Sequence, residues 1–108
     1  MIVEMRVYHC EPTRLPALLN RFETITLDFF AKYGIRQIGF WTTLVGPSNH
    51  ALTYMLQWDS LADREEKWNA FQADPEWIAK RAATEADKPI VERIENHFLT
   101  PTAFSALR

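Results

Sequence analysis

The sequence predicts a single α+β domain in which one strand, one helix, two strands, one helical region and a last strand follow each other. Three observations support this order. The length of 108 residues, 47% of them apolar, suits one compact core. Runs with a period of two alternate with runs of helical period. Glycine and proline separate them. With right-handed crossovers, this βαββαβ order gives a four-stranded antiparallel sheet with both helical regions on one face.

Residues 2–10 form the predicted first strand, because two alternations of different polarity run through them. One alternation is largely apolar and the other carries charged and aromatic side chains. The first comprises Val3, Met5, Val7 and His9, and the second comprises Ile2, Glu4, Arg6, Tyr8 and Cys10.

The next segment predicts a helix of roughly 20 residues, since apolar side chains recur every three or four positions. Thr13 is the predicted N-cap, and Pro16 falls in the first turn, where a missing N–H costs nothing. Gly34 follows the last apolar position and can adopt the left-handed conformation that ends helices. The stripe comprises Leu15, Leu18, Leu19, Phe22, Ile25, Phe29, Phe30 and Tyr33.

Two extended runs, 35–45 and 50–58, predict a β-hairpin, because they are rich in β-branched and aromatic residues. The tetrapeptide between them, Gly46-Pro47-Ser48-Asn49, has the composition of a turn.

The second helical region is predicted in two parts. Ser60 with Asp63 resembles a capping box, and Asp74 followed by Pro75 begins a second helix that extends to about Glu85. Residues 90–99 then form the last predicted strand. The domain is expected to span 1–101, with 102–108 as a C-terminal tail.

One face of such a sheet has no helices on it. Arg6, Tyr8 and Trp41 are expected there, which is too aromatic a surface for a small domain to expose to water. We therefore expect a homodimer in which two sheets pack face to face with the helices outside.

Charge and composition exclude several functions. A net charge of −2 has the wrong sign for a protein that holds nucleic acid by counterion release. No apolar run approaches the ~18 residues of a membrane span, and the charged start of the chain lacks the pattern of a secretory signal. Cys10 is the only cysteine, which fits a reducing, cytoplasmic location. With three glycines and no metal-binding motif, the sequence predicts neither a nucleotide site nor a metal or other cofactor.

Candidate binding residues lie on the predicted strands. Arg6 and Tyr8 could hold the polar end of a ligand, although cross-strand ion pairing explains Arg6 equally and a dimer contact explains Tyr8. Trp41, Tyr54 and Trp58 could line an apolar cavity or belong to the core and the interface.

Histidines are the candidate proton carriers, because their pKa lies near neutrality. His50 and His9 come first, and His97 is the third. They are far apart in sequence, so only the fold could bring them together.

Several of these residues together form a pattern that resembles the NIPSNAP family over residues 2–101. The pattern comprises Glu4-Met5-Arg6-Val7-Tyr8, Pro12, Gly39-Phe40-Trp41, Gly46-Pro47-Ser48-Asn49, Leu56-Gln57-Trp58, Ser60-Leu61, Arg64, Asp74-Pro75-Glu76-Trp77, Phe98-Leu99 and Pro101. Its most specific parts are the Arg-x-Tyr of the first strand and the Asp-Pro-Glu-Trp start of the last helix. The chain has Thr13 where this family often has glycine.

The resemblance implies a ferredoxin-like subunit that pairs into a dimeric α/β barrel, and it implies no catalytic residues. The expected function is binding of a small apolar or aromatic metabolite in the cleft between sheet and helices. Two alternatives stay open: a non-catalytic interaction module, and an enzyme similar to cofactor-free monooxygenases or haem-handling proteins of the same fold.

Overall fold

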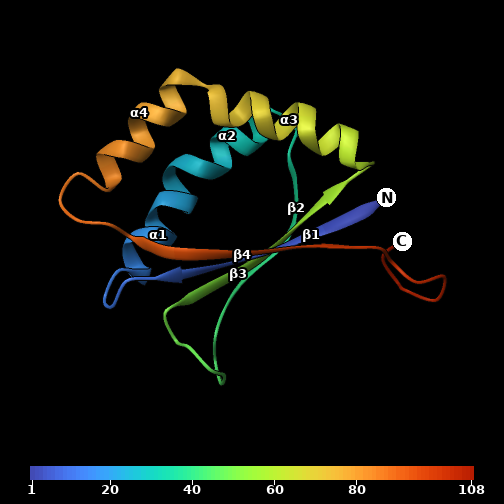
Figure 1. Ribbon diagram of the computed structural model, residues 1–108, viewed down its shortest axis with the longest axis horizontal. Coiled ribbons are helices and arrows are strands. Elements are labelled where there is room, and N and C mark those ends of the chain that lie inside the picture. The colour runs from blue at the N-terminus through green and yellow to red at the C-terminus, as the bar shows by residue number, and fades with distance from the viewer.

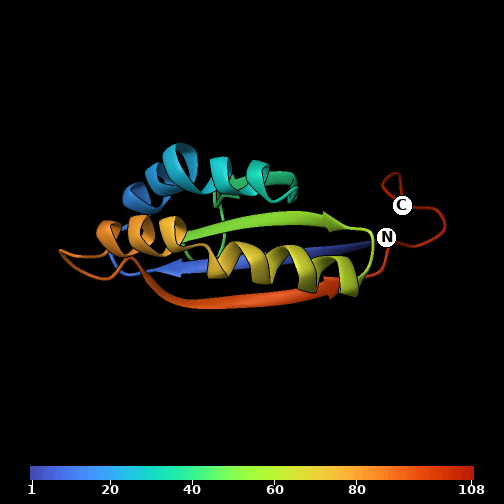
Figure 2. The same cartoon turned by 90° about the horizontal axis from the view of Figure 1, so that it is seen from above.

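The computed structural model describes residues 1–108 and has the predicted βαββαβ order (Figure 1). One antiparallel sheet has the strand order β2-β3-β1-β4, and all helices cover one of its faces (Figure 2). The strands are β1 (Ile2–Cys10), β2 (Arg36–Thr42), β3 (Ala51–Trp58) and β4 (Val91–Leu99). The helical segments are α1 (Leu15–Arg21), η1 (Phe22–Thr26), α2 (Leu27–Lys32), α3 (Leu61–Ala73) and α4 (Pro75–Thr84). The prediction of a ferredoxin-like α+β subunit is confirmed.

β1 is a central strand, and its register determines what lies side by side under the helices. Arg6 is opposite Tyr54 on β3 and Asn96 on β4. Side chains directly opposite each other in a sheet share a face. Residues from three strands therefore meet around Arg6.

The polar alternation of β1 faces the helices. Glu4, Arg6, Tyr8 and Cys10 are buried there, so the prediction that Arg6 and Tyr8 lie on the uncovered face is wrong. The physical reason is that β3 and the helices supply partners that a hydrophobicity pattern cannot show. Trp41 does lie on the uncovered face, 49% exposed.

The first helical region is interrupted. Its middle turn, η1, is a π-helix, in which the Thr26 hydroxyl also donates to the carbonyl of Arg21, five residues earlier. Such wide turns arise where one extra residue is inserted into an α-helix. The predicted continuous helix is therefore divided into α1, η1 and α2.

Thr13 does not cap α1. Its φ is +71°, whereas an N-cap residue has extended backbone, and the helix starts after Arg14 without a side-chain cap. The predicted roles of the other helix ends are confirmed: Gly34 has φ +69°, Ser60 accepts a hydrogen bond from the N–H of Asp63, and Asp74 accepts from Glu76 and Trp77.

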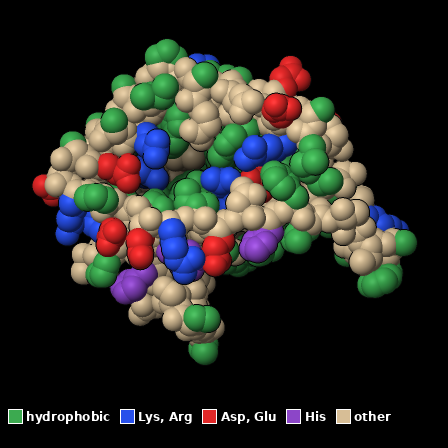
Figure 3. All heavy atoms as spheres, in the orientation of Figure 1, with side chains coloured by type: hydrophobic (Ala, Val, Ile, Leu, Met, Phe, Trp, Pro, Cys, Tyr) green, Lys and Arg blue, Asp and Glu red, His purple; other side chains and the backbone are tan.

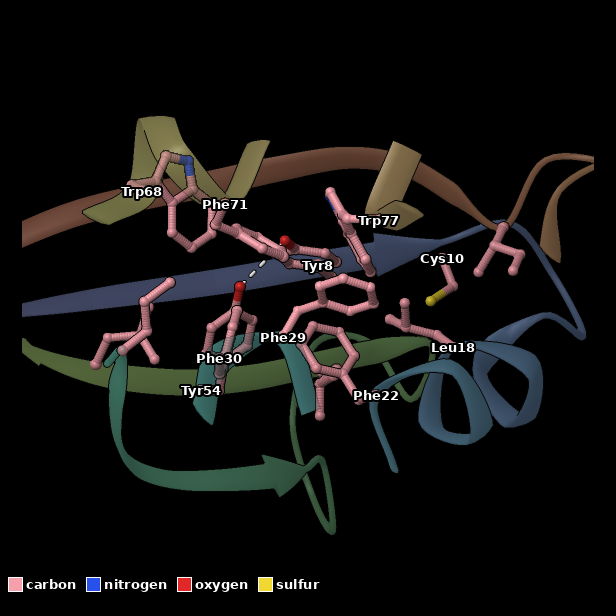
Figure 4. Packing of buried hydrophobic residues seen from close by; sticks show 14 of the residues in the cluster. Tyr8, Cys10, Leu18, Phe22, Phe29, Phe30, Tyr54, Trp68, Phe71 and Trp77 are labelled. Carbon is pink, nitrogen blue, oxygen red and sulfur yellow. Dashed lines mark hydrogen bonds between the residues drawn. The ribbon is translucent and has the colours of Figure 1, made fainter. Parts of the chain in front are cut away.

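Aromatic rings pack against one another between the helices and the sheet (Figure 4). Tyr54 stacks on Phe40 at 4.8 Å, and Phe22 packs edge-on against Tyr8 and Tyr54 at 5.7 and 5.2 Å. Phe71 and Trp77 continue this packing on the α3 and α4 side.

Residues 100–108 form no helix or strand and extend away from the domain (Figure 1). None of the helices has the length and apolar character that crossing a membrane requires.

Candidate functional site: a cavity between the sheet and the helices

A cavity of about 690 Å³ lies between the sheet and the helical layer, within the size range of small-molecule sites. Figure 3 shows the molecule hollowed there, with basic side chains inside the hollow. Three sides of the cavity come from the sheet and the first helical region: β1 and β3 provide Arg6, Tyr8 and Tyr54, β4 provides Val91, Glu92, Arg93 and Ile94, and the first helical region provides Arg21, Phe22, Thr26 and Phe30. The second helical region, including Glu85 directly after α4, provides the remaining lining residues, which are Trp68, Asn69, Phe71, Gln72, Trp77, Arg81 and Glu85.

Arg6 organises the polar part of the sheet wall. Its Nε donates to the Tyr54 hydroxyl at 2.9 Å, one terminal nitrogen donates to the Tyr8 hydroxyl at 3.3 Å, and the other donates to Glu4 at 3.0 Å. The indole of Trp68 lies 4.5 Å from the guanidinium carbon. A guanidinium held on three sides and against an aromatic face has a single orientation.

Glu4 balances part of this charge from behind the cavity. Its carboxylate is fully buried and accepts hydrogen bonds from Arg6, Arg64, Asn96 and the indole N–H of Trp58. Burial alone would raise the pKa of Glu4, but the hydrogen bonds from Arg64 and Asn96 and the charges of Arg6 and Arg64 lower it below its ordinary value. The cluster of Glu4, Arg6 and Arg64 therefore carries one net positive charge.

Tyr54 connects Arg6 to Tyr8. It is completely buried, and its hydroxyl lies 3.1 Å from that of Tyr8 (Figure 4). Burial and the neighbouring Tyr8 raise the pKa of Tyr54 well above its ordinary value. Tyr54 therefore keeps its proton.

Two buried donors that line the cavity have no partner. Arg21 is 4% exposed; a terminal nitrogen donates to Thr84 at 3.3 Å and lies 3.9 Å from Glu85, but Nε is unpaired. The indole N–H of Trp77, 5% exposed, is also unpaired. Burial lowers the pKa of Arg21, against the effect of Glu85. Unpaired buried donors are rare enough in folded proteins to require a reason.

The π-helix contributes directly to this wall. Arg21 precedes η1, and Phe22 and Thr26 are its first and last residues; all three line the cavity. An α-helix with no inserted residue would rotate the residues after the insertion by about 100° around its axis. The inserted residue of η1 therefore determines which side chains of the first helical region face the cavity.

The charged side chains around the cavity are mostly basic. Arg6, Arg21, Arg81 and Arg93 line it together with two carboxylates, Glu85 and Glu92. With Glu4 behind Arg6, the surroundings favour a ligand that carries a negative charge.

The structure brings together three of the predicted binding residues and separates the others. Arg6, Tyr8 and Tyr54 line the cavity. Trp58 is fully buried with its N–H on Glu4, outside the cavity, and Trp41 lies on the opposite face of the sheet.

The histidines lie elsewhere. His9 and His97 are on the uncovered face of the sheet, and His50 is exposed in the hairpin loop, so none of the three lines the cavity. Cys10 is buried, and burial raises the pKa of its thiol, which does not favour a nucleophile. Nowhere do three His, Cys, Asp or Glu side chains gather closely enough to hold a metal ion.

Arg21 and Trp77 are the important residues that sequence reasoning missed. Arg21 carried a usable signal, because it lies three residues after Leu18 and four before Ile25, on the apolar stripe of its helix. A charged residue in that stripe is either paired or facing a cavity. The unpaired N–H of Trp77 has no signal in the sequence.

Both the sequence and the fold of this chain are similar to those of known proteins. The sequence model of the NIPSNAP family matches residues 3–106. A NIPSNAP family protein of Agrobacterium tumefaciens is 29% identical, with a TM-score of 0.88 over 99% of this chain and 98% of that one. An uncharacterized NIPSNAP domain protein of Burkholderia xenovorans is 28% identical, with a TM-score of 0.84 over 97% and 98%. A Mycobacterium tuberculosis protein, Rv0793, shares the fold at 13% identity and a TM-score of 0.62, over 97% and 98%. No curated protein matches the chain.

Proposed function

The chain belongs to the NIPSNAP family, and on that premise we propose that it binds a small metabolite with an apolar or aromatic ring in the cavity between its sheet and its helices. The observation that carries the proposal is the pair of buried, unpaired donors, Arg21 Nε and Trp77 Nε1, in the wall of one cavity. Each of these donors lacks an acceptor within the protein, which a bound ligand would supply.

The rest of the wall suits the body of such a ligand. Phe22, Phe30, Trp68 and Phe71 present aromatic surface beside the polar groups. Nine of the 18 lining residues are hydrophobic and the others are polar or charged, so the wall offers aromatic surface together with several polar groups. The volume of about 690 Å³ admits a ligand of one to three fused rings.

We also propose that the uncovered face of the sheet is the interface of a homodimer. The largely apolar alternation of β1 lies on this face, where Met5 is opposite Met55 on β3. Trp41 on β2 and Leu99 on β4 add apolar surface at 49% and 44% exposure. A protein that buries the charged alternation of a central strand and leaves the apolar one uncovered needs another apolar surface to cover it.

The hairpin loop supports the same interface. Leu44 and Val45, in the loop between β2 and β3, are 97% and 94% exposed, and this loop projects on the side of the sheet away from the helices (Figure 1). A second copy packed on that side would come within reach of these side chains. Sheet-to-sheet packing places the two helical layers outside and leaves each cavity open to solvent.

The cavity proposal is tested by thermal shift and calorimetry with ring compounds: naphthoates, naphthamides, naphthoquinones and flavonoid acids. Binding should raise the melting temperature of the wild type. Val91→Phe, which fills the cavity wall, should abolish the shift, whereas Ala103→Phe in the exposed C-terminal segment should leave it intact. If no compound in the panel stabilises the wild type, or if Val91→Phe binds as well as the wild type, the cavity is not a ligand site and the non-catalytic module is the better account.

A further inference from the structure

The direction of the hydrogen bonds around Arg6 determines which donor is left for a ligand. Arginine has only donors, so the hydroxyl oxygens of Tyr54 and Tyr8 both accept from Arg6. Each phenol still has one proton to donate. The two hydroxyl oxygens are 3.1 Å apart, so one phenol donates to the other.

Tyr54 must be the donor of that pair. It is 0% exposed, and its only hydroxyl contacts are Arg6 and Tyr8, of which Arg6 cannot accept. If Tyr8 donated to Tyr54 instead, the Tyr54 proton would be buried without a partner, at a cost of ~1–3 kcal/mol. The order of donation is therefore Arg6 to Tyr54 to Tyr8.

The Tyr8 proton is then free. Its oxygen already accepts two hydrogen bonds, one of them from a cation, and this polarises the O–H bond. Tyr8 lines the cavity and makes no hydrogen bond as a donor. It thus adds an available donor to a wall in which Arg21 and Trp77 also carry N–H groups without a partner in the protein.

Unpaired donors in a wall that carries four arginines favour an acceptor with a negative charge. We propose that the ligand is a ring carboxylate whose carboxylate accepts from the Tyr8 hydroxyl and Arg21, with its ring against the aromatic wall. The inference rests on the proposed function and adds the charge and orientation of the ligand. Donors aimed at an anion form stronger hydrogen bonds than those aimed at a neutral oxygen.

The two carboxylates near the cavity are consistent with this assignment. Glu85 is already engaged with the backbone N–H of Ile90 at 3.2 Å and lies beside Arg21. Glu92 is exposed on β4, the edge strand at the cavity. Glu85 opposes part of the charge of Arg21, but neither carboxylate accepts a hydrogen bond from its Nε.

The test compares 2-naphthoate with its neutral counterpart 2-naphthamide, which has the same ring and nearly the same shape. Binding is followed by tryptophan fluorescence, since Trp68 and Trp77 line the cavity, and by calorimetry. The wild type should bind the acid at least about tenfold more tightly than the amide. Tyr8→Phe should remove most of this preference while amide binding stays nearly unchanged.

Tyr33→Phe is the matched control, because it removes a phenol hydroxyl that bonds to Asp74 and lies outside the cavity. Its preference should equal that of the wild type. If Tyr8→Phe does not fold, Arg21→Met provides the second measurement and should also lose the preference. Equal binding of acid and amide to the wild type would overturn the assignment and leave the cavity proposal standing, whereas failure of every ring compound would overturn the cavity proposal itself.

Discussion

Arg64 on α3 donates to both carboxylate oxygens of Glu4 on β1, at 3.2 Å each and across sixty residues of chain. This paired contact joins the second helical region to the centre of the sheet beside the cavity. It also explains why β1 can bury a carboxylate, because the charge of Glu4 is opposed by Arg64 and by Arg6. The orientation of Arg6 at the cavity depends on this neutralisation.

Replacing Glu4 should destabilise the fold strongly. Glu4→Gln leaves two arginines without their counter-charge, and breaking a buried ion pair from one side costs about 3–5 kcal/mol. The free energy of unfolding, measured in urea, should fall by about that amount. Glu76→Gln removes the half-exposed pair with Lys80 and should change it by only about 0.3–0.5 kcal/mol. Equal effects of the two substitutions would contradict the role given to Glu4.

Acid should destabilise the protein partly through Asp74. Hydrogen bonds from Lys32 and Tyr33 lower the pKa of Asp74 well below its ordinary value of 3.8. A group whose pKa is lower in the folded state contributes stability that is present above its unfolded pKa and is lost as the pH falls. Between pH 6 and pH 3 the urea midpoint of the wild type should therefore fall more than that of Asp74→Asn, which cannot titrate. Parallel declines in the two proteins would rule out this contribution.

Thr13 should be a site where glycine stabilises the chain. Its φ of +71° is unfavourable for a β-branched residue, and the side chain is exposed and caps nothing. Thr13→Gly should raise the free energy of unfolding by about 0.5–1 kcal/mol, because relief of strain exceeds the added flexibility of the unfolded chain. Thr102→Gly, where φ is not positive, should give no gain. A loss of stability in Thr13→Gly would show that the turn is not strained.

The dimer proposal predicts a specific effect of charge on the uncovered face. Met55→Glu places a carboxylate at the centre of that face, opposite Met5. Light scattering should give the wild type twice its chain mass of 12.6 kDa and the variant a mass near 12.6 kDa. Ile78→Glu, at an exposed apolar position on α4, should stay dimeric. A monomeric wild type at micromolar concentration would end the proposal.

The element order and the caps at Ser60 and Asp74 could be predicted from the sequence, because turn chemistry and periodicity act locally. The inward face of β1 could not. Its apolar alternation faces away from the helices, and the charged one is buried because Arg64 and Tyr54, distant in sequence, provide its partners. The π-helix was also beyond prediction, since one inserted residue hardly alters an apolar stripe.

The residues of the candidate site could likewise be predicted only in part. Arg6, Tyr8 and Tyr54 could be identified as polar and aromatic residues on central strands. Trp41 does not line the cavity because it lies on the uncovered face of the sheet, and Trp58 does not because it is buried beside Glu4, to which its N–H is bonded. The positions of both tryptophans depend on packing between segments that are distant in sequence, which one sequence does not reveal.

The four indole N–H groups offer the most direct measurement, an NMR titration of protein labelled with ¹⁵N at tryptophan. We predict that 2-naphthoate shifts the signals of Trp77 and Trp68 most, because both residues line the cavity and the N–H of Trp77 has no partner within the protein. Trp58, bonded to Glu4, and Trp41, on the opposite face, should change little. A titration that moves Trp41 while Trp77 stays in place would contradict this prediction, because the ligand would then bind on the other face of the sheet.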